Sequence, residues 1–444
     1  MPACLKLGRW SQAPSNGTTG GRLGVGIPPR ARKVLCTALI VVASAGAAGA
    51  FDQLANSRVV VAPRAAEPQY LVQVSDPVFG TAFTRVTEPG RVMATGVSCR
   101  SDHCTHRYSS SQAWNADQTL LVIANGCAGG FCFLDGQTFQ PLFHRRIPNE
   151  CEWHPTDAAT MICVSRQAIY LWKPRSNETE TVFAPAGYTN LQFGPYKANP
   201  SDDGTRLVVR AKDSAGKLVA FAYDIPARKK YPDIDLSKLD GANGFCGISP
   251  SGRYVLCLQT LFDGTETAFV FGLDGTVIQH WTDHHRPAHG DMTIDADGRD
   301  VYVGISKADP DKYHVIKRRL EDGVVTDLAP YGEATHASLR NIDRPGWVFL
   351  SYTGTYEEVA SHPHWAPFYQ EVVALRIDGS GEVRRIVQTR NPKADYWSET
   401  HATPSRDGSQ VIWSSNWGRV GGPVSDYVAR LSWPATAARK QSLR

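Results

Sequence analysis

The sequence predicts an all-β protein whose main part is a seven-bladed β-propeller closed by pairing of its N- and C-terminal strands. Three observations predict this fold. One turn-and-strand phrase recurs seven times after residue 100, long helical periodicity is absent, and a strand pair outside the repeats at the N-terminal end can complete the last blade.

Each repeat begins with a turn rich in Asp, Gly, Ser or Pro and continues as an alternating apolar strand, as in NPSDDGTRLVVR (199–210) and ISPSGRYVLCL (248–258). An Asp-Gly pair supplies the positive φ of a tight hairpin, and the residues after it alternate between the two faces of a strand. The turn positions recur at steps of 40, 46, 48, 46, 46 and 64 residues, at Asp117, Asp157, Asp203, Ser251, Asp297, Asp343 and Asp407. Repeats of about 40–50 residues are typical of four-stranded propeller blades.

The two ends of the repeat array predict how the ring closes. The strand pair Tyr70–Val74 and Thr81–Val86 has no repeat turn of its own, and the last strand, Asp426–Leu431, lacks an outer partner. Pairing these ends completes one blade from both termini and removes an exposed edge.

The first fifty residues have the composition of a targeting segment. They carry six basic residues and no acidic ones, and the apolar run Val34–Ala50 ends in Ala48-Gly49-Ala50, which is typical of a secretory signal peptide. The alternative is an uncleaved membrane anchor, although a run of 17 residues is short for a span of about 20. We therefore expect a signal peptide at 1–50, a linker at 51–69, the propeller at 70–433 and a tail at 434–444.

Removal of residues 1–50 changes the net charge from +4 to −2, so no basic surface remains that would indicate nucleic-acid binding. No later segment is apolar enough to cross a bilayer. The eight cysteines beyond residue 50 fall into the close pairs Cys99/Cys104, Cys127/Cys132, Cys151/Cys163 and Cys246/Cys257. Such spacing favours local disulfides and an oxidising compartment, with a zinc–thiolate site as the alternative.

In a propeller, the residues that lead into the innermost strands gather at one mouth of the central channel. At these positions the sequence has mostly polar side chains: Gln112, Glu150, Glu152, Tyr196, Lys197, Asn243, His289, Asp291, His336, Glu399 and His401. The segments AHGD, ATHAS and SETHA each put a histidine at the same point of the phrase in blades five, six and seven. Three imidazoles beside a carboxylate suit Mn²⁺, Fe²⁺ or Zn²⁺, although each histidine alone could equally be structural.

A second candidate cluster lies in blade one, in CTHRYSSSQAWNAD (104–117). His106 and Tyr108 can supply a base or an acid, and Arg107 can pair bidentately with a carboxylate. The alternative is that Tyr108 packs between blades and Arg107 is solvated.

The segments HRYSSSQAWNADQTLL (106–121), AHGDMTIDADG (288–298) and YWSETHATPSRDGSQVIWSSNWG (396–418) resemble those of oligogalacturonate lyases and other propeller-type polysaccharide lyases. The repeat turns also resemble those of TolB-like proteins. The lyase resemblance implies a secreted seven-bladed enzyme that cleaves uronic-acid polymers by β-elimination and holds a divalent ion, typically manganese, through histidines and a glutamine.

Carried over to this chain, the resemblance implies His289, His336 and His401 as metal ligands, with Gln370 in WAPFYQEV as the glutamine. Glu399 or Asp291 is the fourth ligand if Gln370 lies elsewhere. The resemblance also implies His106 and Tyr108 as the base and acid. Manganese is the expected ion, with Zn, Fe or Ca as alternatives.

We therefore expect a secreted or periplasmic, monomeric lyase that binds an acidic oligosaccharide at the channel mouth. His106, Arg107 and Tyr108 are the predicted catalytic residues, and Gln112, Glu150, Lys197 and Asn243 the predicted substrate-binding residues. A metal or an arginine would neutralise the dianion formed when the proton beside a uronate carboxylate is removed. The alternative function is a non-catalytic, TolB-like propeller that binds a protein or glycan partner on the same face.

Overall fold

A computed structural model describes residues 52–53, 58–146, 150–194, 198–236, 239–261, 266–283, 289–306, 309–332, 335–361, 367–392 and 395–433. The chain divides into two units, residues 1–49 and 50–444, and the described residues all belong to the second unit. The predicted signal peptide and the predicted C-terminal tail lie outside the described residues.

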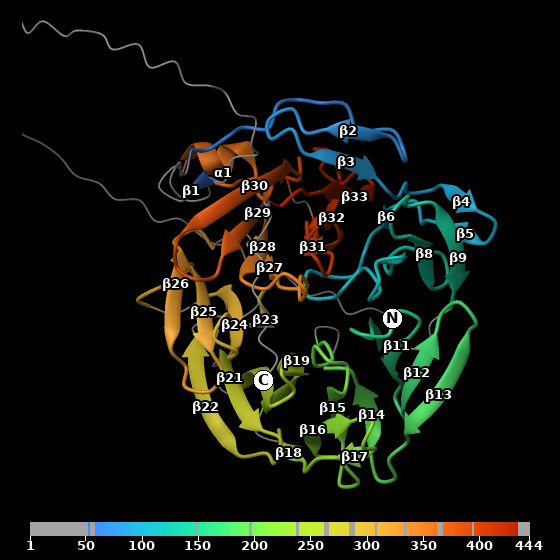
Figure 1. Ribbon diagram of the computed structural model, residues 1–444, viewed down its shortest axis with the longest axis vertical. Helices are drawn as coiled ribbons and strands as arrows, with labels where there is room; N and C mark the ends of the chain where they lie inside the picture. The colour runs from blue at the N-terminus through green and yellow to red at the C-terminus, as the bar shows by residue number, and fades with distance from the viewer. Residues whose placement is uncertain are drawn as a thin grey trace, which may run out of the picture. The chain divides into compact units, whose positions relative to one another are not determined.

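Seven of the eight sheets among the described residues are arranged in a ring, so the predicted seven-bladed propeller is confirmed (Figure 1). Blade one contains β7 (Leu120–Ile123), β8 (Phe131–Asp135) and β9 (Pro141–Arg145), and blade two contains β10 (Glu150–Trp153), β11 (Met161–Val164), β12 (Ile169–Lys173) and β13 (Glu178–Phe183). Blade three contains β14 (Thr189–Gln192), β15 (Arg206–Lys212), β16 (Leu218–Asp224), β17 (Lys229–Lys230) and β18 (Ile234–Asp235). Blade four contains β19 (Leu239–Ile248), β20 (Tyr254–Leu261), β21 (Glu266–Gly272) and β22 (Val277–Asp283).

Blade five contains β23 (Asp291–Ile294), β24 (Asp300–Ile305), β25 (Val315–Arg319) and β26 (Val325–Ala329). Blade six contains β27 (Thr335–Ser338), β28 (Trp347–Tyr352), β29 (Glu371–Arg376) and β30 (Glu382–Gln388), with β1 (Asp52–Gln53) on its outer edge and α1 (Tyr356–Ser361) between β28 and β29. Blade seven contains β31 (Thr403–Pro404), β32 (Gln410–Ser415), β33 (Val424–Arg430), β3 (Ala82–Arg85) and β2 (Gln73–Ser75). The remaining short elements are β4 (Val92–Ala94), β5 (Val97–Ser98), β6 (His103–Cys104) and the 3-10 helix η2 (Tyr396–Ser398).

The repeat turns adopt the conformation that their sequence predicts. The Ser201 hydroxyl donates to Asp203 Oδ1 at 2.5 Å, and the same oxygen accepts the amide of Thr205 at 2.9 Å. Gly204 has a φ of +76°, which a glycine adopts without steric cost. The hairpin is therefore fixed within a few residues, which is why the phrase can be recognised in the sequence.

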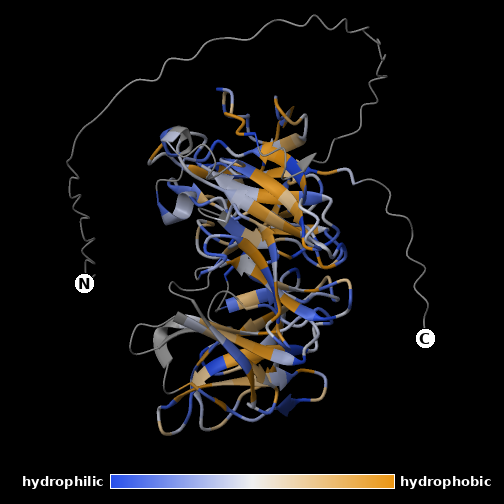
Figure 2. Ribbon diagram, turned by 90° about the vertical axis from the view of Figure 1, so that its left-hand side faces the viewer, coloured by the Kyte–Doolittle hydropathy of each residue, from blue (hydrophilic) through white to orange (hydrophobic). Residues whose placement is uncertain are grey.

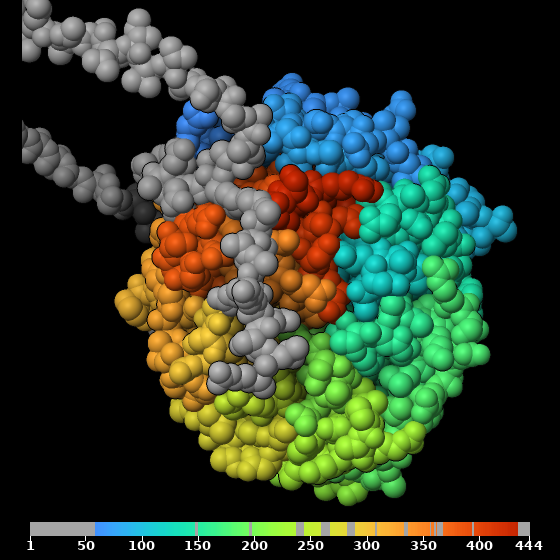
Figure 3. Space-filling view, viewed as in Figure 1, coloured from blue at the N-terminus to red at the C-terminus, as the bar shows by residue number. Residues whose placement is uncertain are grey.

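Blade seven closes the ring from both ends of the chain, as predicted. Strand β3 pairs antiparallel with β33, with Phe83 opposite Ala429 and Arg85 opposite Tyr427. On the face seen in Figure 3, the red C-terminal segments accordingly lie between the orange segments of blade six and the blue and cyan N-terminal segments. The pairing gives β33 the outer partner that it would otherwise lack.

Apolar side chains fill the space between neighbouring blades. Each of the seven hydrophobic clusters among the described residues combines side chains of two consecutive blades, including the pair of blades seven and one. The hydrophobic colour in Figure 2 accordingly concentrates on the strands, while the connecting loops are mostly hydrophilic. The blades therefore share their cores with their neighbours, as propeller architecture requires.

All four predicted disulfides form: Cys99–Cys104, Cys127–Cys132, Cys151–Cys163 and Cys246–Cys257. The last two join residues that lie directly opposite each other on the two innermost strands of blades two and four. Four disulfides are typical of a chain that folds in an oxidising compartment. Within the described part of the chain, no helix has both the length and the apolar character to span a bilayer.

Residues 58–69, expected to be a linker, are bound to the outside of blades six and seven. The carbonyl of Val60 accepts the Gln388 amide at 3.1 Å, and the carbonyl of Ala65 accepts Trp417 Nε1 at 3.0 Å. The Tyr427 hydroxyl donates to Glu67 at 2.7 Å. This segment therefore adds a second connection between the N-terminal region and the closing blade.

Phe83→Ala tests the contribution of ring closure to stability. Phe83 is buried and its ring lies 5.7 Å from that of Trp413 and 6.0 Å from that of Trp417, so its truncation leaves a cavity in blade seven. We expect the free energy of unfolding, measured with denaturant, to fall by about 3–5 kcal/mol. Val78→Ala, at a position that is 40% exposed between β2 and β3, is the control. A loss below about 1 kcal/mol for Phe83→Ala would contradict a structural role for this closure.

Candidate metal centre

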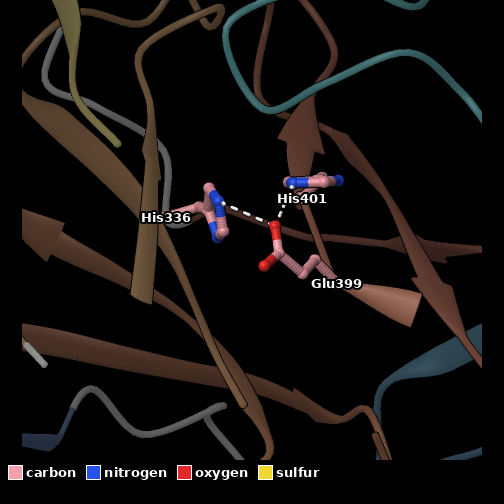
Figure 4. A group of neighbouring side chains, drawn as sticks. All are labelled: His336, Glu399 and His401. Atoms are coloured by element: carbon pink, nitrogen blue, oxygen red, sulfur yellow. Dashed lines mark hydrogen bonds and ion pairs between the residues drawn. The ribbon is translucent and has the colours of Figure 1, made fainter. Parts of the chain in front are cut away.

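Three side chains with metal-binding atoms meet at the inner edges of blades six and seven: His336, Glu399 and His401. One donor atom from each lies within 4.8 Å of the other two. Glu399 Oε2 is 3.1 Å from His401 Nε2 and 3.5 Å from His336 Nε2, and Figure 4 shows the carboxylate between the two imidazoles. We call these three residues the metal centre.

Two blades supply the metal centre. His336 is the second residue of β27, the innermost strand of blade six. Glu399 and His401 lie between η2 and β31, the innermost strand of blade seven. Asp395 and Ser398 cap η2 reciprocally, each accepting the other's backbone amide at 3.0 Å. This capping box fixes the direction in which the chain enters the segment that carries Glu399 and His401.

His289, from blade five, lies against the metal centre. Its half-buried ring stacks on that of His336, with the centroids 4.1 Å apart and the planes 7° apart, and the rings of His336 and His401 are 4.4 Å apart. The structure thus brings together the histidines of three consecutive blades. The predicted role of His289 as a metal ligand stays a prediction.

The backbone is in an unusual conformation at two of these histidines. His289 has a φ of +67° and His401 a φ of +44°, in the left-handed region that non-glycine residues rarely occupy. A hydrogen bond holds each in place, because the His289 carbonyl accepts the amide of Ala337 at 2.7 Å and the His401 carbonyl accepts His106 Nε2 at 2.6 Å. Strain that the surroundings maintain in this way is typical of functional sites.

Gln370, the predicted glutamine ligand, lies one residue before β29. Its Nε2 donates to the carbonyl of Gly354 at 3.0 Å, and its role as a metal ligand through the amide oxygen stays a prediction. Asp291, the alternative carboxylate ligand, forms a bidentate ion pair with Arg340, with both distances 2.8 Å, and accepts the amide of Leu339 at 2.8 Å. Glu399 is therefore the carboxylate that the structure brings to the histidines.

His106, predicted as a catalytic base, is fully enclosed. Its Nδ1 is 3.1 Å from both carboxylate oxygens of Asp426, and its Nε2 contacts the carbonyl of His401. Burial opposes charge on the imidazole, but the Asp426 carboxylate and the His401 carbonyl outweigh it and raise the pKa of His106. Both ring nitrogens of His106 face acceptors. The geometry therefore favours a role in positioning His401 over a role as a base that takes a proton from the substrate.

Tyr108, another predicted catalytic residue, packs its ring against the imidazoles of the metal centre. Its buried ring lies 4.5 Å from that of His401 and 5.5 Å from that of His336. Burial, with smaller contributions from Tyr396 and Glu399, raises the pKa of Tyr108 well above its ordinary value. The phenol is therefore protonated at neutral pH and can act as a proton donor beside the metal centre.

Arg107 bonds to the innermost strand of blade two. Its Nη1 donates to Glu152 at 2.5 Å and to the carbonyl of Cys151 at 3.0 Å. Gln112 bonds to backbone groups, with its amide donating to the carbonyl of Arg340 at 2.9 Å. This bonding favours a structural role for Gln112 over the predicted contact with substrate.

The other predicted substrate-binding residues have different outcomes. Glu150 lines a cavity together with Arg107. Lys197 lies outside the described residues, and of Asn243 only the backbone, in β19, is described.

The donor set of the metal centre fits a divalent metal ion. His336 and His401 are only 4% and 6% exposed, and the Glu399 carboxylate supplies the negative charge that a cation needs. Two histidines and one carboxylate form a known ligand set for iron and zinc and are suited to manganese. The three residues would hold the ion and leave further coordination positions open to a substrate oxygen.

Asp426 is the main residue of this region that the sequence does not reveal. It lies in the apolar strand β33, is completely buried, and accepts hydrogen bonds from the His106 backbone amide and the Ser414 hydroxyl. The sequence indicates Asp426 only by a single acidic residue within the apolar segment VSDYVAR. Its partner His106 is 320 residues away.

Comparison with known proteins finds similarity in structure only. No family model and no curated protein matches the sequence. An oligogalacturonate lyase in complex with manganese has a TM-score of 0.57 and 16% sequence identity, over 81% of this chain and 96% of that chain. An oligogalacturonate lyase from Vibrio parahaemolyticus has a TM-score of 0.56 and 12% identity over the same shares. The chain therefore resembles these enzymes in fold, as the sequence motifs predict.

Glu152→Gln tests the electrostatics beside Arg107. Burial raises the pKa of Glu152 to about 7 from an ordinary value of 4.5, so the folded protein binds this proton more tightly than the unfolded chain. The free energy of unfolding should therefore fall as the pH rises from about 4.5 to about 7. Relative to Glu152→Gln, wild type should lose up to about 3 kcal/mol between about pH 5 and pH 8 in denaturant titrations. Glu178→Gln, on the exposed strand β13, should follow wild type, and parallel curves for wild type and Glu152→Gln would contradict the raised pKa.

Proposed function

We propose that this protein is an exported, metal-assisted lyase that cleaves uronic-acid oligosaccharides by β-elimination. The observation that carries the proposal is the cluster of His336, Glu399 and His401 within a propeller that resembles a manganese-bound oligogalacturonate lyase. The signal-like segment at 1–50 and the four disulfides support a secreted or periplasmic location. Because one chain supplies the whole cluster, a monomer is sufficient for the reaction.

In such an elimination, a water molecule takes the proton at C5 beside the uronate carboxylate, a C4–C5 double bond forms, and the C4–O bond to the next sugar breaks. The leaving oxygen takes up a proton from Tyr108, which regains one from the solvent. A divalent ion held by His336, Glu399 and His401 would stabilise the negative charge that develops on the carboxylate. Manganese is the ion that we propose, with His289 beside the ligands.

Tyr108 is the proton-transfer residue of the proposal. Its ring lies against both histidines of the metal centre, and its phenol hydroxyl is protonated at neutral pH, as a donor to the leaving oxygen must be. We assign His106 a positioning role through the carbonyl of His401 in place of the predicted role as a base.

His336→Ala tests the proposal. The purified chain should contain a stoichiometric divalent metal by elemental analysis and release unsaturated uronates from one of a panel of pectic, alginate or ulvan oligomers, followed by ultraviolet absorbance. His336→Ala should lose the metal and lower the elimination rate about a hundredfold or more. His314→Ala, at a partly exposed histidine of blade five that pairs with Asp327 at 2.8 Å, is the matched control and should retain both.

Two results would overturn the lyase. One is a metal-free wild-type chain that remains inactive on the whole panel after addition of manganese. The other is elimination that is unaffected by His336→Ala. Binding of a glycan or protein without cleavage would instead favour the alternative of a non-catalytic binding propeller.

A further inference from the structure

A cavity of about 430 Å³ lies among blades one, two and three. Its polar lining consists of Arg107, Asn125, Glu150, Arg166 and Gln192. The volume is in the range of small-molecule sites, about 300–1,000 Å³. We call it the arginine cavity.

The two arginines that line the cavity have N–H groups that are not used in hydrogen bonds with the described residues. The exposed side chain of Arg166 forms no hydrogen bond or ion pair with the residues that the structure describes. Arg107 uses Nη1 for both of its contacts, with Glu152 and the carbonyl of Cys151, and its other nitrogens have no acceptor in the described part of the chain. Two guanidinium groups therefore face one cavity with donors for a further acceptor.

A third guanidinium lies directly behind the cavity wall. Arg210 is 5% exposed and donates to Gln192 Oε1 at 3.2 and 3.4 Å and to the carbonyl of Gly244 at 2.8 Å. No carboxylate of the described residues lies within ion-pair distance of it. A buried charge that has only neutral hydrogen-bond acceptors is costly. Because none of these acceptors is charged, Arg210 adds its positive charge to the region. The three guanidiniums outnumber the two nearby carboxylates, Glu150 and Glu152.

One lining residue of the arginine cavity, Arg107, immediately precedes Tyr108, whose ring contacts the metal centre. Asn125, in the cavity wall, donates to the carbonyls of His106 at 2.7 Å and Arg107 at 3.2 Å and so holds this segment in place. The following residue, Tyr108, contacts the rings of His336 and His401. One peptide bond thus separates a lining residue of the cavity from a residue that touches the metal centre.

We propose that the arginine cavity is an anionic subsite that binds the carboxylate of a uronate unit next to the unit bound at the metal centre, through Arg166 and Arg107. The inference rests on the proposed function, because it names how the substrate is recognised beyond the reacting unit. The planar guanidinium donates two parallel hydrogen bonds to a carboxylate, which a neutral ester cannot accept with the same strength. The subsite therefore selects acidic over esterified oligosaccharides.

Binding measured without turnover tests the subsite. The full mature chain, dialysed against a chelator to prevent cleavage, is titrated calorimetrically with trigalacturonate, trimannuronate or a ulvan trimer, and with the methyl ester of each. We expect at least one acid to bind about fivefold or more tightly than its ester, with the difference shrinking as salt is added. Arg166→Gln should remove most of this preference. Arg166→Glu should lower the affinity for the acidic oligosaccharide further. Arg64→Gln, at an exposed arginine without an ion pair among the described residues, should leave it unchanged.

Equal binding of acid and ester, no binding of any acid, or an acid preference unaffected by both Arg166 variants would overturn the subsite. These outcomes are separate from those that test the lyase. If acid-selective binding depends on Arg166 but no unsaturated product forms with any added metal ion, the subsite stands and the elimination is excluded. If elimination occurs but the acid preference does not depend on Arg166, the elimination stands and the subsite is excluded.

Discussion

The packing of each blade against its two neighbours is the constraint on which the rest of this structure depends. Every hydrophobic cluster of the described residues is shared between consecutive blades, so no blade has a complete core of its own. The same geometry brings the inner strands together. His289, His336 and His401 meet because blades five, six and seven are adjacent, although the histidines lie far apart in the sequence.

Features that depend on near neighbours in the sequence could be predicted. The hairpin around Asp203 is determined by Ser201, Gly204 and Thr205, so the number of such phrases gave the number of blades. The cysteine pairs also followed from short spacing, because partners such as Cys151 and Cys163 lie on strands of one hairpin. Closure could be inferred because strands without partners remained at both ends.

The arrangement of the site could be predicted only in part. Register within the repeat brought three histidines to one mouth, but it could not show that His106 is enclosed by Asp426 and His401, since these partners come from the opposite end of the chain. It also could not distinguish Glu399 from Asp291 as the carboxylate, because the bidentate pairing of Asp291 with Arg340 depends on contacts between blades. Arg166 and Arg210 follow no motif, and only the folded ring brings Arg166 into the cavity lining and Arg210 against Gln192 of that lining.

The position of Asp426 on β33 has a consequence for the timing of assembly. Asp426 orients His106, and His106 holds the carbonyl of His401, so the geometry of His401 depends on the last strand of the chain. A polypeptide that is still being synthesised lacks this strand, and its β3 edge has no partner. The geometry of His401 therefore arises only in the closed molecule, after β33 has been made and has paired with β3.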